Sequence, residues 1–242
     1  MISSGTDIPW KGRLDALKSE VHLYSCNIVD LDVTSYCQWA TDEERLKANR
    51  FRKEEDALRF LMGRAIAKFV LAKYLDLSIS NISILPGDNK KPIASCTEKN
   101  IDFPHFNISH SGNRVVVAFA NEPIGVDIEE VKDIGVADLA ETVFSDNELN
   151  LFKESKHSLF TFYKLWTGKE ALLKALGLGL VDDLKEIDIS KGVDVAFVSK
   201  HSPLKLKLES FEIEKDYLCS VCYTEEKQAV LFELPAEAVN GL

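Results

Sequence analysis

Four charged side chains in the second half of the chain have the types and the spacing that a site for a metal ion and a phosphate needs. Asp127 and Glu129 stand two residues apart in a segment that alternates like a strand, so both carboxylates leave by the same face. Glu170 and Lys174 stand four residues apart, which places a carboxylate and an ammonium on one face of a helix. Paired carboxylates suit a hard cation such as Mg²⁺, which prefers oxygen ligands.

Both patterns also have an ordinary structural interpretation. A Glu followed four residues later by a Lys is a favoured pair on helix surfaces, worth roughly 0.2–0.5 kcal/mol. Phe162 and Trp166 continue the same helical face toward its N-terminal end, and aromatic residues at this spacing are typical of a core. The two strand carboxylates also fit the solvated face of an amphipathic strand. Gly125, just before them, leaves room for the close approach of a ligand or of a helix backbone.

A second polar set precedes an apolar run at residues 115–120. Residues 107–111 (Asn-Ile-Ser-His-Ser) combine an amide, hydroxyls and an imidazole, which are all groups that bind phosphate oxygens. We expect a loop here, for which an ordinary turn rich in Asn and Ser is the alternative. The apolar run and residues 124–129 are expected to pair as a hairpin.

The elements that must position these groups recur in the same order in both halves. Residues 41–44 and 145–148 both fit the capping-box pattern at a helix start. Long helices are expected at about 57–74 and at 159–176, the second ending at Gly177. Strand-like segments are residues 21–26, 82–85, 186–189, 193–198, 204–209, 218–223 and 229–234.

This recurrence indicates a weak internal duplication. The predicted fold is α+β, with two similar subdomains in a pseudo-twofold arrangement, each a long helix packed on a small antiparallel sheet. Residues 1–120 form the first subdomain and residues 121–242 the second, with the active site expected in the cleft between them. Two fused halves also predict a monomer.

Composition bounds the function further. The chain has 242 residues and a net charge of −10, which argues against a nucleic-acid binder with a basic face. No apolar run reaches the roughly 18 residues of a membrane span, and the first ten residues lack a signal-peptide pattern. The five cysteines are odd in number and mostly scattered, which predicts a reducing cytoplasm. Cys219 and Cys222 stand on an expected strand and are interpreted as core thiols.

Three blocks taken together resemble the signature of the 4′-phosphopantetheinyl transferases, and the two similar halves resemble their Sfp-type branch. The resemblance covers residues 40–180. It rests on Phe-Asn-Ile-Ser-His-Ser at 106–111, Gly-Val-Asp-Ile-Glu at 125–129, and Trp166, Lys169, Glu170 and Lys174, with further matches at Phe51, Asp56, Gly63, Lys91 and Pro92.

The resemblance implies a role for each matching residue. Asp127, Glu129 and Glu170 would hold Mg²⁺ together with the pyrophosphate of coenzyme A, which Lys174 would also contact. Glu170 would accept the proton of the attacking serine, either directly or through a metal-bound water. The remaining coenzyme contacts would come from Lys47, Arg64, Lys91, Asn107, Ser109 and His110, with His110 on the 3′-phosphate.

One position departs from the family pattern. Sfp-type members can carry a lysine where this chain has Glu44, so Arg50 or Arg52 would have to compensate in binding the 3′-phosphate.

The implied reaction moves the phosphopantetheine arm of coenzyme A to a serine of an acyl, peptidyl or polyketide carrier protein and releases adenosine 3′,5′-bisphosphate. A docking patch for the carrier is expected at residues 136–144. The alternatives are a catalytically silent coenzyme A-binding protein and a metal-dependent phosphodiesterase that uses the same acids.

Overall fold

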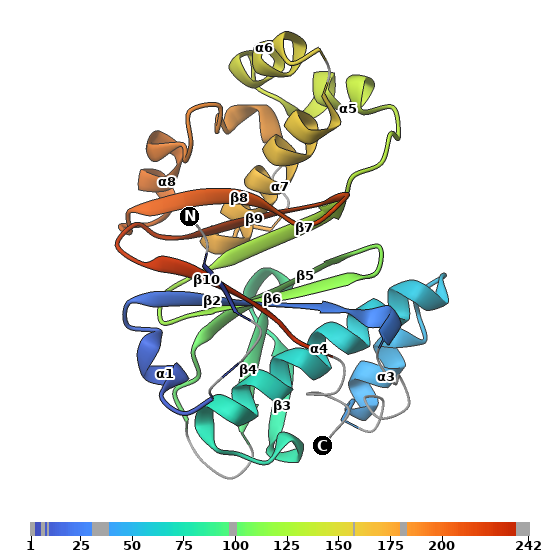
Figure 1. Cartoon of the computed structure of the whole chain (residues 1–242), viewed down its shortest axis with the longest axis vertical. Helices are drawn as coiled ribbons and strands as arrows, with labels where there is room; N and C mark the ends of the chain where they lie inside the picture. Colours follow the sequence, from blue (N-terminus) through green and yellow to red (C-terminus); the bar gives the residue numbers. More distant parts are fainter. Residues whose placement is uncertain are drawn as a thin grey trace. The chain divides into compact units, whose positions relative to one another are not determined.

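The computed structural model of the chain describes residues 3–5, 8, 10–30, 39–96, 101–156, 158–179 and 183–235. The chain divides into two compact units. The first contains residues 1–121 and 227–242, and the second contains residues 122–226. Figure 1 labels most of the helices and strands of the two units, which are described separately below.

The first unit is built on a five-stranded sheet in the order β1-β10-β2-β6-β5. Strands β1, β10 and β2 pair in parallel, whereas β2, β6 and β5 pair antiparallel. The long helix α4 (Glu54–Leu75) packs on β5 and β6. The strands are β1 Ser3–Gly5, β10 Gln228–Glu233, β2 Glu20–Asn27, β6 Arg114–Ala120 and β5 His105–Ser111.

Shorter elements complete this unit. A two-stranded antiparallel sheet pairs β3 with β4, and helix α3 begins at a capping box in which Thr41 and Glu44 exchange hydrogen bonds. The bounds are α1 Arg13–Ala16, η1 Ile28–Asp30, α3 Asp42–Ala48, η2 Ile79–Asn81, β3 Ile82–Pro86, η3 Asp88–Lys90 and β4 Pro92–Cys96.

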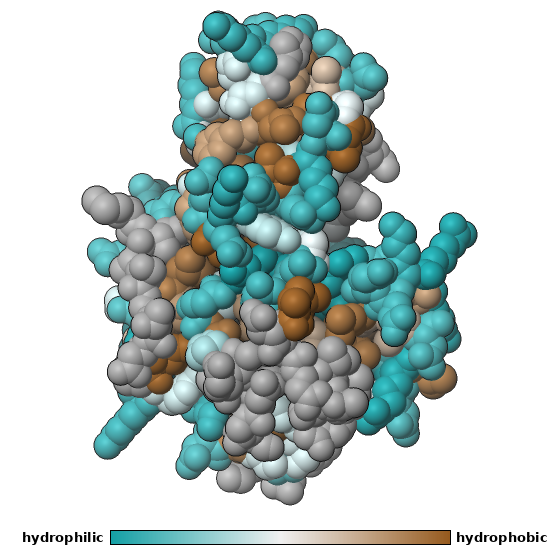
Figure 2. Space-filling model, turned by 45° about the vertical axis from the view of Figure 1, so that its right-hand side comes forward, coloured by the Kyte–Doolittle hydropathy of each residue, from teal (hydrophilic) through white to brown (hydrophobic). Residues whose placement is uncertain are grey.

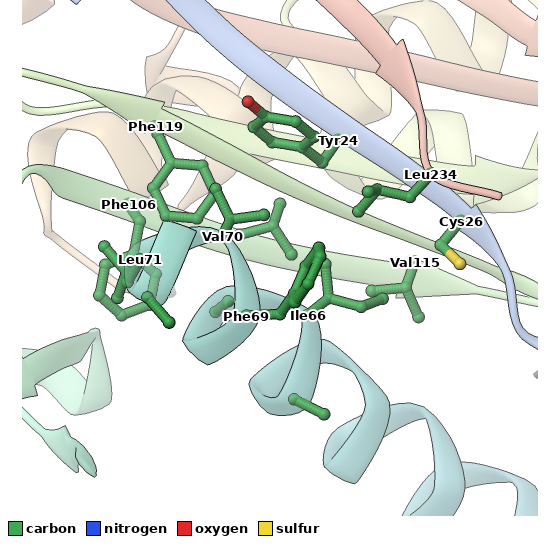
Figure 3. Close-up of a cluster of buried hydrophobic side chains, with 14 of the residues drawn as sticks. Tyr24, Cys26, Ile66, Phe69, Val70, Leu71, Phe106, Val115, Phe119 and Leu234 are labelled. Carbon is green, nitrogen blue, oxygen red and sulfur yellow. The ribbon is translucent and has the colours of Figure 1, made fainter. Parts of the chain in front are cut away.

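The core of the first unit lies between α4 and its sheet. Figure 3 shows side chains of α4, among them Ile66, Phe69 and Val70, beside Tyr24 of β2 and Phe119 of β6. All five are at most 1% exposed. From Met62 to Tyr74 nearly every residue of α4 is buried, so this part of the helix is enclosed on most of its circumference and not on one face alone.

The second unit is a three-stranded antiparallel sheet in the order β7-β9-β8, on which the long helix α7 packs (Figure 1). The bounds are β7 Gly125–Glu130, α5 Val136–Val143, α6 Asp146–Glu154, α7 Leu159–Leu176, η4 Leu184–Glu186, α8 Val195–His201, β8 Leu206–Glu214 and β9 Tyr217–Thr224. Gly177 ends α7 in the left-handed conformation, with φ of 69°. In the described part of the chain no helix has the length and apolar character to cross a membrane.

The α+β class, both long helices, both capping boxes and the end of α7 agree with the sequence. Cys219 and Cys222 are fully buried on β9, as core thiols. The first sheet differs from the expected antiparallel sheet because its first three strands pair in parallel.

Other expectations were wrong. Residues 107–111 are not a loop but lie in β5, and β6 forms its hairpin with β5 instead of β7. Residues 186–189 form no strand, and residues 195–201 form helix α8, which Asp194 caps through the amide of Phe197. Strand β10 belongs to the sheet of the first unit, so the second unit ends at residue 226 and not at 242.

A buried histidine in the first unit predicts how stability depends on pH. The His22 ring is fully buried, with Nδ1 2.6 Å from the Tyr74 hydroxyl and Nε2 2.8 Å from the Glu20 carboxylate. Burial lowers the pKa of His22 below 6.5, because it disfavours the charged ring more than Glu20 favours it. The folded state therefore binds this proton less readily than the unfolded chain.

We expect the free energy of unfolding to be unaffected by His22 above its unfolded pKa and to fall as the pH drops below about 6.5. Urea unfolding of the wild type and of His22→Gln across this range measures the effect as a slope, which should be shallower in the variant. His201→Gln, at an exposed position, is the control and should keep the wild-type slope. Equal slopes for the wild type and His22→Gln would contradict the prediction.

Candidate functional site

Asp127 and Lys174 form the centre of the polar site in the second unit. Lys174, in the last turn of α7, places Nζ 2.6 Å from Asp127 Oδ1 and 3.2 Å from the carbonyl oxygen of Val126 on β7. The Asp127 side chain is 6% exposed and the Lys174 side chain 28% exposed. The carboxylate is therefore fixed in the sheet, while the ammonium reaches it from the helix and keeps partial access to solvent.

Gly125 explains how the helix comes so close to the strand. A Cβ at this position would lie 2.0 Å from the carbonyl oxygen of Ala171 and 2.3 Å from the amide nitrogen of Ala175, both backbone atoms of α7. Only glycine allows this approach. Of the two interpretations of Gly125 in the sequence, the structure shows the close approach of a helix backbone.

Glu170 lies one turn before Lys174 and is half-buried. Burial raises the pKa of the Glu170 carboxyl; Asp127 raises it further, and Lys174 opposes the shift. The negative charge of Asp127 on β7 therefore disfavours the ionised form of Glu170 on α7. Glu129 is half-buried on β7, on the same face of the strand as Asp127.

The chemistry of these three acids suits a hard divalent cation, because all their donors are carboxylate oxygens. Among the described residues, no three acidic, histidine or cysteine side chains are grouped closely enough to hold an ion. The ammonium of Lys174 lies instead against Asp127 Oδ1 and supplies the positive charge there. The acids have the oxygen donors that Mg²⁺ prefers, whereas the cation that the structure places at Asp127 is the lysine ammonium.

The aromatic residues at the N-terminal end of the same helical face pack in or against the core, as the structural interpretation of the sequence expected. The rings of Phe162 and Trp166 stack with centroids 6.3 Å apart and an angle of 10° between their planes. Phe162 is 2% exposed and Trp166 is half-buried. This face of α7 therefore runs from the hydrophobic core to the polar site.

The polar residues of β5, in the first unit, are divided between the two faces of its sheet. Asn107 and Ser109 alternate on one face and are buried, whereas Ile108 and His110 point to the other. The Ile108 side chain packs against Gly63 of α4, which identifies the second face as the α4 side. The structure therefore does not bring the side chains of Ser109 and His110 to one face.

His110 lies near charged groups at the start of α4. Asp56 and Arg59 pair at 2.5 Å, and Arg59 donates to the carbonyl oxygen of Gly112 at 2.9 Å, which ties α4 to the β5–β6 turn. Arg59 lowers the pKa of the partly exposed Asp56 carboxyl, and His110 adds a smaller effect. The sequence pointed to Asp56 only as a family match, and the role of Arg59 was missed.

Lys47 and Arg64 both lie over the aromatic ring of Phe60. Lys47 Nζ and Arg64 Cζ each lie 4.8 Å from the centroid of the Phe60 ring. Arg64 also donates to the carbonyl oxygen of Ile84 at 2.9 Å and lies 3.5 Å from Glu44 Oε1. Arg64 is thus held by internal partners, whereas Lys47 is exposed on α3.

The departure at Glu44 has a structural explanation. The side chain is 5% exposed, and its Oε2 accepts from the amide of Thr41 at 2.9 Å and from Lys68 Nζ at 2.7 Å. Glu44 therefore serves the interior of the first unit. Lys91 follows η3 and is half-buried, where its carbonyl accepts from the amide of Gly87 at 2.8 Å.

The segment expected to dock a partner forms α5 and buries Val136 and Ala140. Ile134, just before the helix, is 62% exposed and Leu139 is 38% exposed. In Figure 2, hydrophobic side chains gather among hydrophilic ones over the part of the second unit that contains α5 to α7. The apolar side chains of this segment are thus divided between the core and the solvent.

Two family models together match most of the chain. Residues 123–222 match the model described as the 4′-phosphopantetheinyl transferase superfamily. Residues 30–122 match the model described as 4′-phosphopantetheinyl transferase, N-terminal. The first match contains Asp127, Glu129, Glu170 and Lys174, and the second contains the polar residues of β5.

Curated relatives match over a similar span. The 4′-phosphopantetheinyl transferase Sfp of Bacillus subtilis (strain 168) is 33% identical over 195 residues, which are 77% of this chain and 83% of that protein. The transferase ffp of Bacillus subtilis is 35% identical over 188 residues, 74% of this chain and 80% of that protein. The transferase gsp of Aneurinibacillus migulanus is 30% identical over 202 residues, 81% of each chain.

Proposed function

Because the chain belongs to the 4′-phosphopantetheinyl transferase superfamily, we propose that it moves the 4′-phosphopantetheine arm of coenzyme A to a serine of an apo carrier protein. The serine Oγ forms a bond to the phosphorus next to the pantetheine arm. The bond from that phosphorus to the bridging oxygen breaks, and adenosine 3′,5′-bisphosphate leaves with the electron pair. The observation that supports this most is the Asp127–Lys174 pair beside Glu170, at the contact of α7 with β7.

Asp127, Glu129 and Glu170 would hold Mg²⁺ through their carboxylate oxygens. When bound, the ion supplies positive charge that stabilises the charge developing on the pyrophosphate. Lys174 supplies further positive charge to the same oxygens, and its partly exposed ammonium can reach a ligand while Asp127 orients it. These residues therefore neutralise the anion that would otherwise repel the attacking hydroxyl.

Glu170 takes the proton of the serine hydroxyl in this proposal. Burial raises the pKa of Glu170, which makes its carboxylate a stronger proton acceptor than an exposed glutamate. Because α7 is held on β7 at Gly125, the Glu170 carboxylate is carried at a fixed place on the helix–strand contact.

The polar residues of the first unit would bind the adenosine side of coenzyme A. Lys47 and Lys91 are cations suited to phosphate, and His110 supplies an imidazole for the 3′-phosphate. We assign Asn107 and Ser109 to the ADP portion as well; because their side chains leave β5 by the face opposite His110, the coenzyme would have to pass the edge of the sheet at β5. Arg64 would act mainly by holding Phe60 and Glu44 in place, since its donors already have internal acceptors.

The partner would be an acyl, peptidyl or polyketide carrier protein, for which we propose docking at residues 134–144. The apolar side chains of Ile134 and Leu139 support this, because they are exposed at the edge of α5. The chain itself is acidic, with a net charge of −10, so general electrostatic attraction would not draw an acidic partner, whereas an apolar contact does not depend on net charge.

One assay separates transfer from the two alternatives. Purified protein is mixed with Mg²⁺, coenzyme A and an apo carrier protein, and both carrier and coenzyme are weighed by mass spectrometry. We expect the carrier to gain the mass of one phosphopantetheine. Cleaved coenzyme with an unchanged carrier would indicate a phosphodiesterase, and unchanged coenzyme and carrier would indicate a silent binding protein. Either of those results would overturn the proposal.

A further inference from the structure

Lys169, next to Glu170 on α7, is a buried cation that the proposed reaction does not use. Its side chain is 1% exposed, and Nζ lies 2.5 Å from Glu148 Oε2, 2.9 Å from the carbonyl oxygen of Val143 and 2.7 Å from that of Leu184. The ammonium thus binds three acceptors from outside its own helix. Together they connect α7 to the end of α5, the start of α6 and the first residue of η4.

Both carboxylate oxygens of Glu148 also have internal hydrogen-bond partners. It is fully buried, and its Oε2 also accepts from the amide of Ser145 at 2.8 Å as part of the capping box of α6. Its other oxygen accepts from the amide of Ile189 at 2.9 Å. One carboxylate therefore caps a helix, binds the lysine of the next helix and holds the segment after η4.

The first unit contains the same arrangement. Lys68 of α4 lies 2.7 Å from Glu44 Oε2, the same oxygen that accepts from the capping-box residue Thr41. Lys68 also donates to the carbonyl oxygen of Trp39 at 2.8 Å. Trp39 stands two residues before Thr41, and Val143 stands two residues before Ser145. The long helix of each unit is therefore anchored by one lysine to the same two sites at the start of the preceding helix.

The contacts of Lys169 constrain the orientation of α7. A residue on an α-helix is offset by about 100° and 1.5 Å from its neighbour, so fixing Lys169 also fixes the direction in which Glu170 points. Gly125 sets the distance between α7 and β7, and the buried side chains of α7 pack the helix on its sheet. To this packing Lys169 adds hydrogen bonds whose geometry is directional.

We propose that Lys169 and Glu148 form a positioning clamp, which holds α7 in the rotation that directs Glu170 and Lys174 to Asp127. This inference rests on the proposed function for its kinetic consequence. It differs from a role in stability alone, because buried ion pairs are often no more stabilising than neutral residues of the same shape. What the clamp supplies is an orientation, since both of its charged groups also bind backbone atoms of neighbouring segments.

The double variant Lys169→Met with Glu148→Gln separates orientation from stability. After Glu148→Gln, the side-chain amide oxygen can still cap α6 or accept from Ile189. After Lys169→Met, the thioether side chain fills most of the lysine's volume. Because both partners are now neutral, no buried charge is left unpaired. We expect the melting temperature to recover relative to the single variant Lys169→Met. The kcat for transfer should remain about 10- to 100-fold below wild type, because the bonds to Val143 and Leu184 are lost. A double variant with wild-type kcat would overturn the proposal.

The first unit provides a matched control. Lys68→Met with Glu44→Gln removes the same clamp from α4, far in sequence from the acids of the second unit. We expect kcat at saturating coenzyme A to stay within about twofold of wild type, with any loss confined to KM for the coenzyme. An equal fall in kcat in both double variants would mean that the effect is general destabilisation and would overturn the assignment to α7.

A second measurement does not depend on transfer. The rate at which an amine-reactive acetylating reagent modifies Lys174, followed by peptide mass spectrometry, reports how firmly Lys174 is held at Asp127. We expect severalfold faster modification in the second-unit double variant and an unchanged rate in the first-unit control. Unchanged rates in both would overturn the clamp. A wild type that fails to transfer would instead refute the proposed function and leave this measurement to decide on the clamp.

Discussion

Asp127→Asn and Glu170→Gln are each expected to lower the rate of phosphopantetheine transfer by at least about 10²–10³-fold, comparable to the removal of one group that stabilises a transition state. Asp127 loses the charge that would bind the ion and that orients Lys174, whose Nζ lies 2.6 Å away. Glu170 loses both a ligand oxygen and the proton acceptor. Initial rates of carrier modification, measured by mass spectrometry, give the effect directly.

The fold should survive both substitutions. Asn and Gln keep the shapes of the acids, and Lys174 keeps partial access to water when its partner is neutral. Glu130→Gln is the matched control, because Glu130 lies on the same strand but pairs with the exposed Lys132 at 2.7 Å. It should retain wild-type transfer. Full activity in purified Asp127→Asn or Glu170→Gln would refute the assignment of the acids.

Gly125→Ala should have the second largest effect, on both stability and transfer. The added Cβ would meet the backbone of Ala171 at 2.0 Å and of Ala175 at 2.3 Å, and backbone atoms cannot rotate away. Helix α7 must therefore move away from β7, at a cost of about 1–3 kcal/mol or more for overpacking. Because Glu170 and Lys174 travel with the helix, a shift of about 1 Å should also lower the rate about 10²-fold. Urea unfolding and initial rates measure the two effects.

Gly168→Ala tests whether the backbone contact is the cause. A Cβ at residue 168, on the same helix, would meet the side-chain atoms Ile189 Cδ1 at 2.5 Å and Leu208 Cδ2 at 3.1 Å, which can move aside. Replacement of a helical glycine by alanine also contributes about 1 kcal/mol of favourable helix propensity. Gly168→Ala should therefore be clearly milder than Gly125→Ala. Wild-type stability and rate in Gly125→Ala would contradict the account of how α7 reaches β7.

Elements with a local signal could be predicted from the sequence. The capping boxes at Thr41 and Ser145 and the glycine that ends α7 depend on contacts within a few residues, and the structure confirms all three. Pairing between strands depends on the rest of the chain. Strand β10 was identified as a strand, but its partners β1 and β2 are more than 200 residues away in sequence, and no local pattern encodes them.

In the candidate site, too, some features follow from local sequence and others depend on how distant segments pack. Alternation along β7 predicted that Asp127 and Glu129 share a face, because strand geometry alone fixes it. The 2.6 Å contact of Lys174 with Asp127 could not be predicted, since it depends on how closely α7 approaches β7. The positions of Ser109 and His110 were misjudged because residues 107–111 were expected to be a loop. As a strand, the segment sends neighbouring side chains to opposite faces.

The binding of a divalent ion tests the central claim most directly. That claim is that Asp127, Glu129 and Glu170 together bind one ion. Mn²⁺ is the probe, since its electron paramagnetic resonance signal distinguishes free from bound ion, and the titration is run with coenzyme A present. We predict one bound Mn²⁺ per chain in the wild type and in Glu130→Gln, with binding lost or strongly weakened in Asp127→Asn, Glu129→Gln and Glu170→Gln. Wild-type Mn²⁺ affinity in all three acid variants, or no bound ion in the wild type, would contradict it.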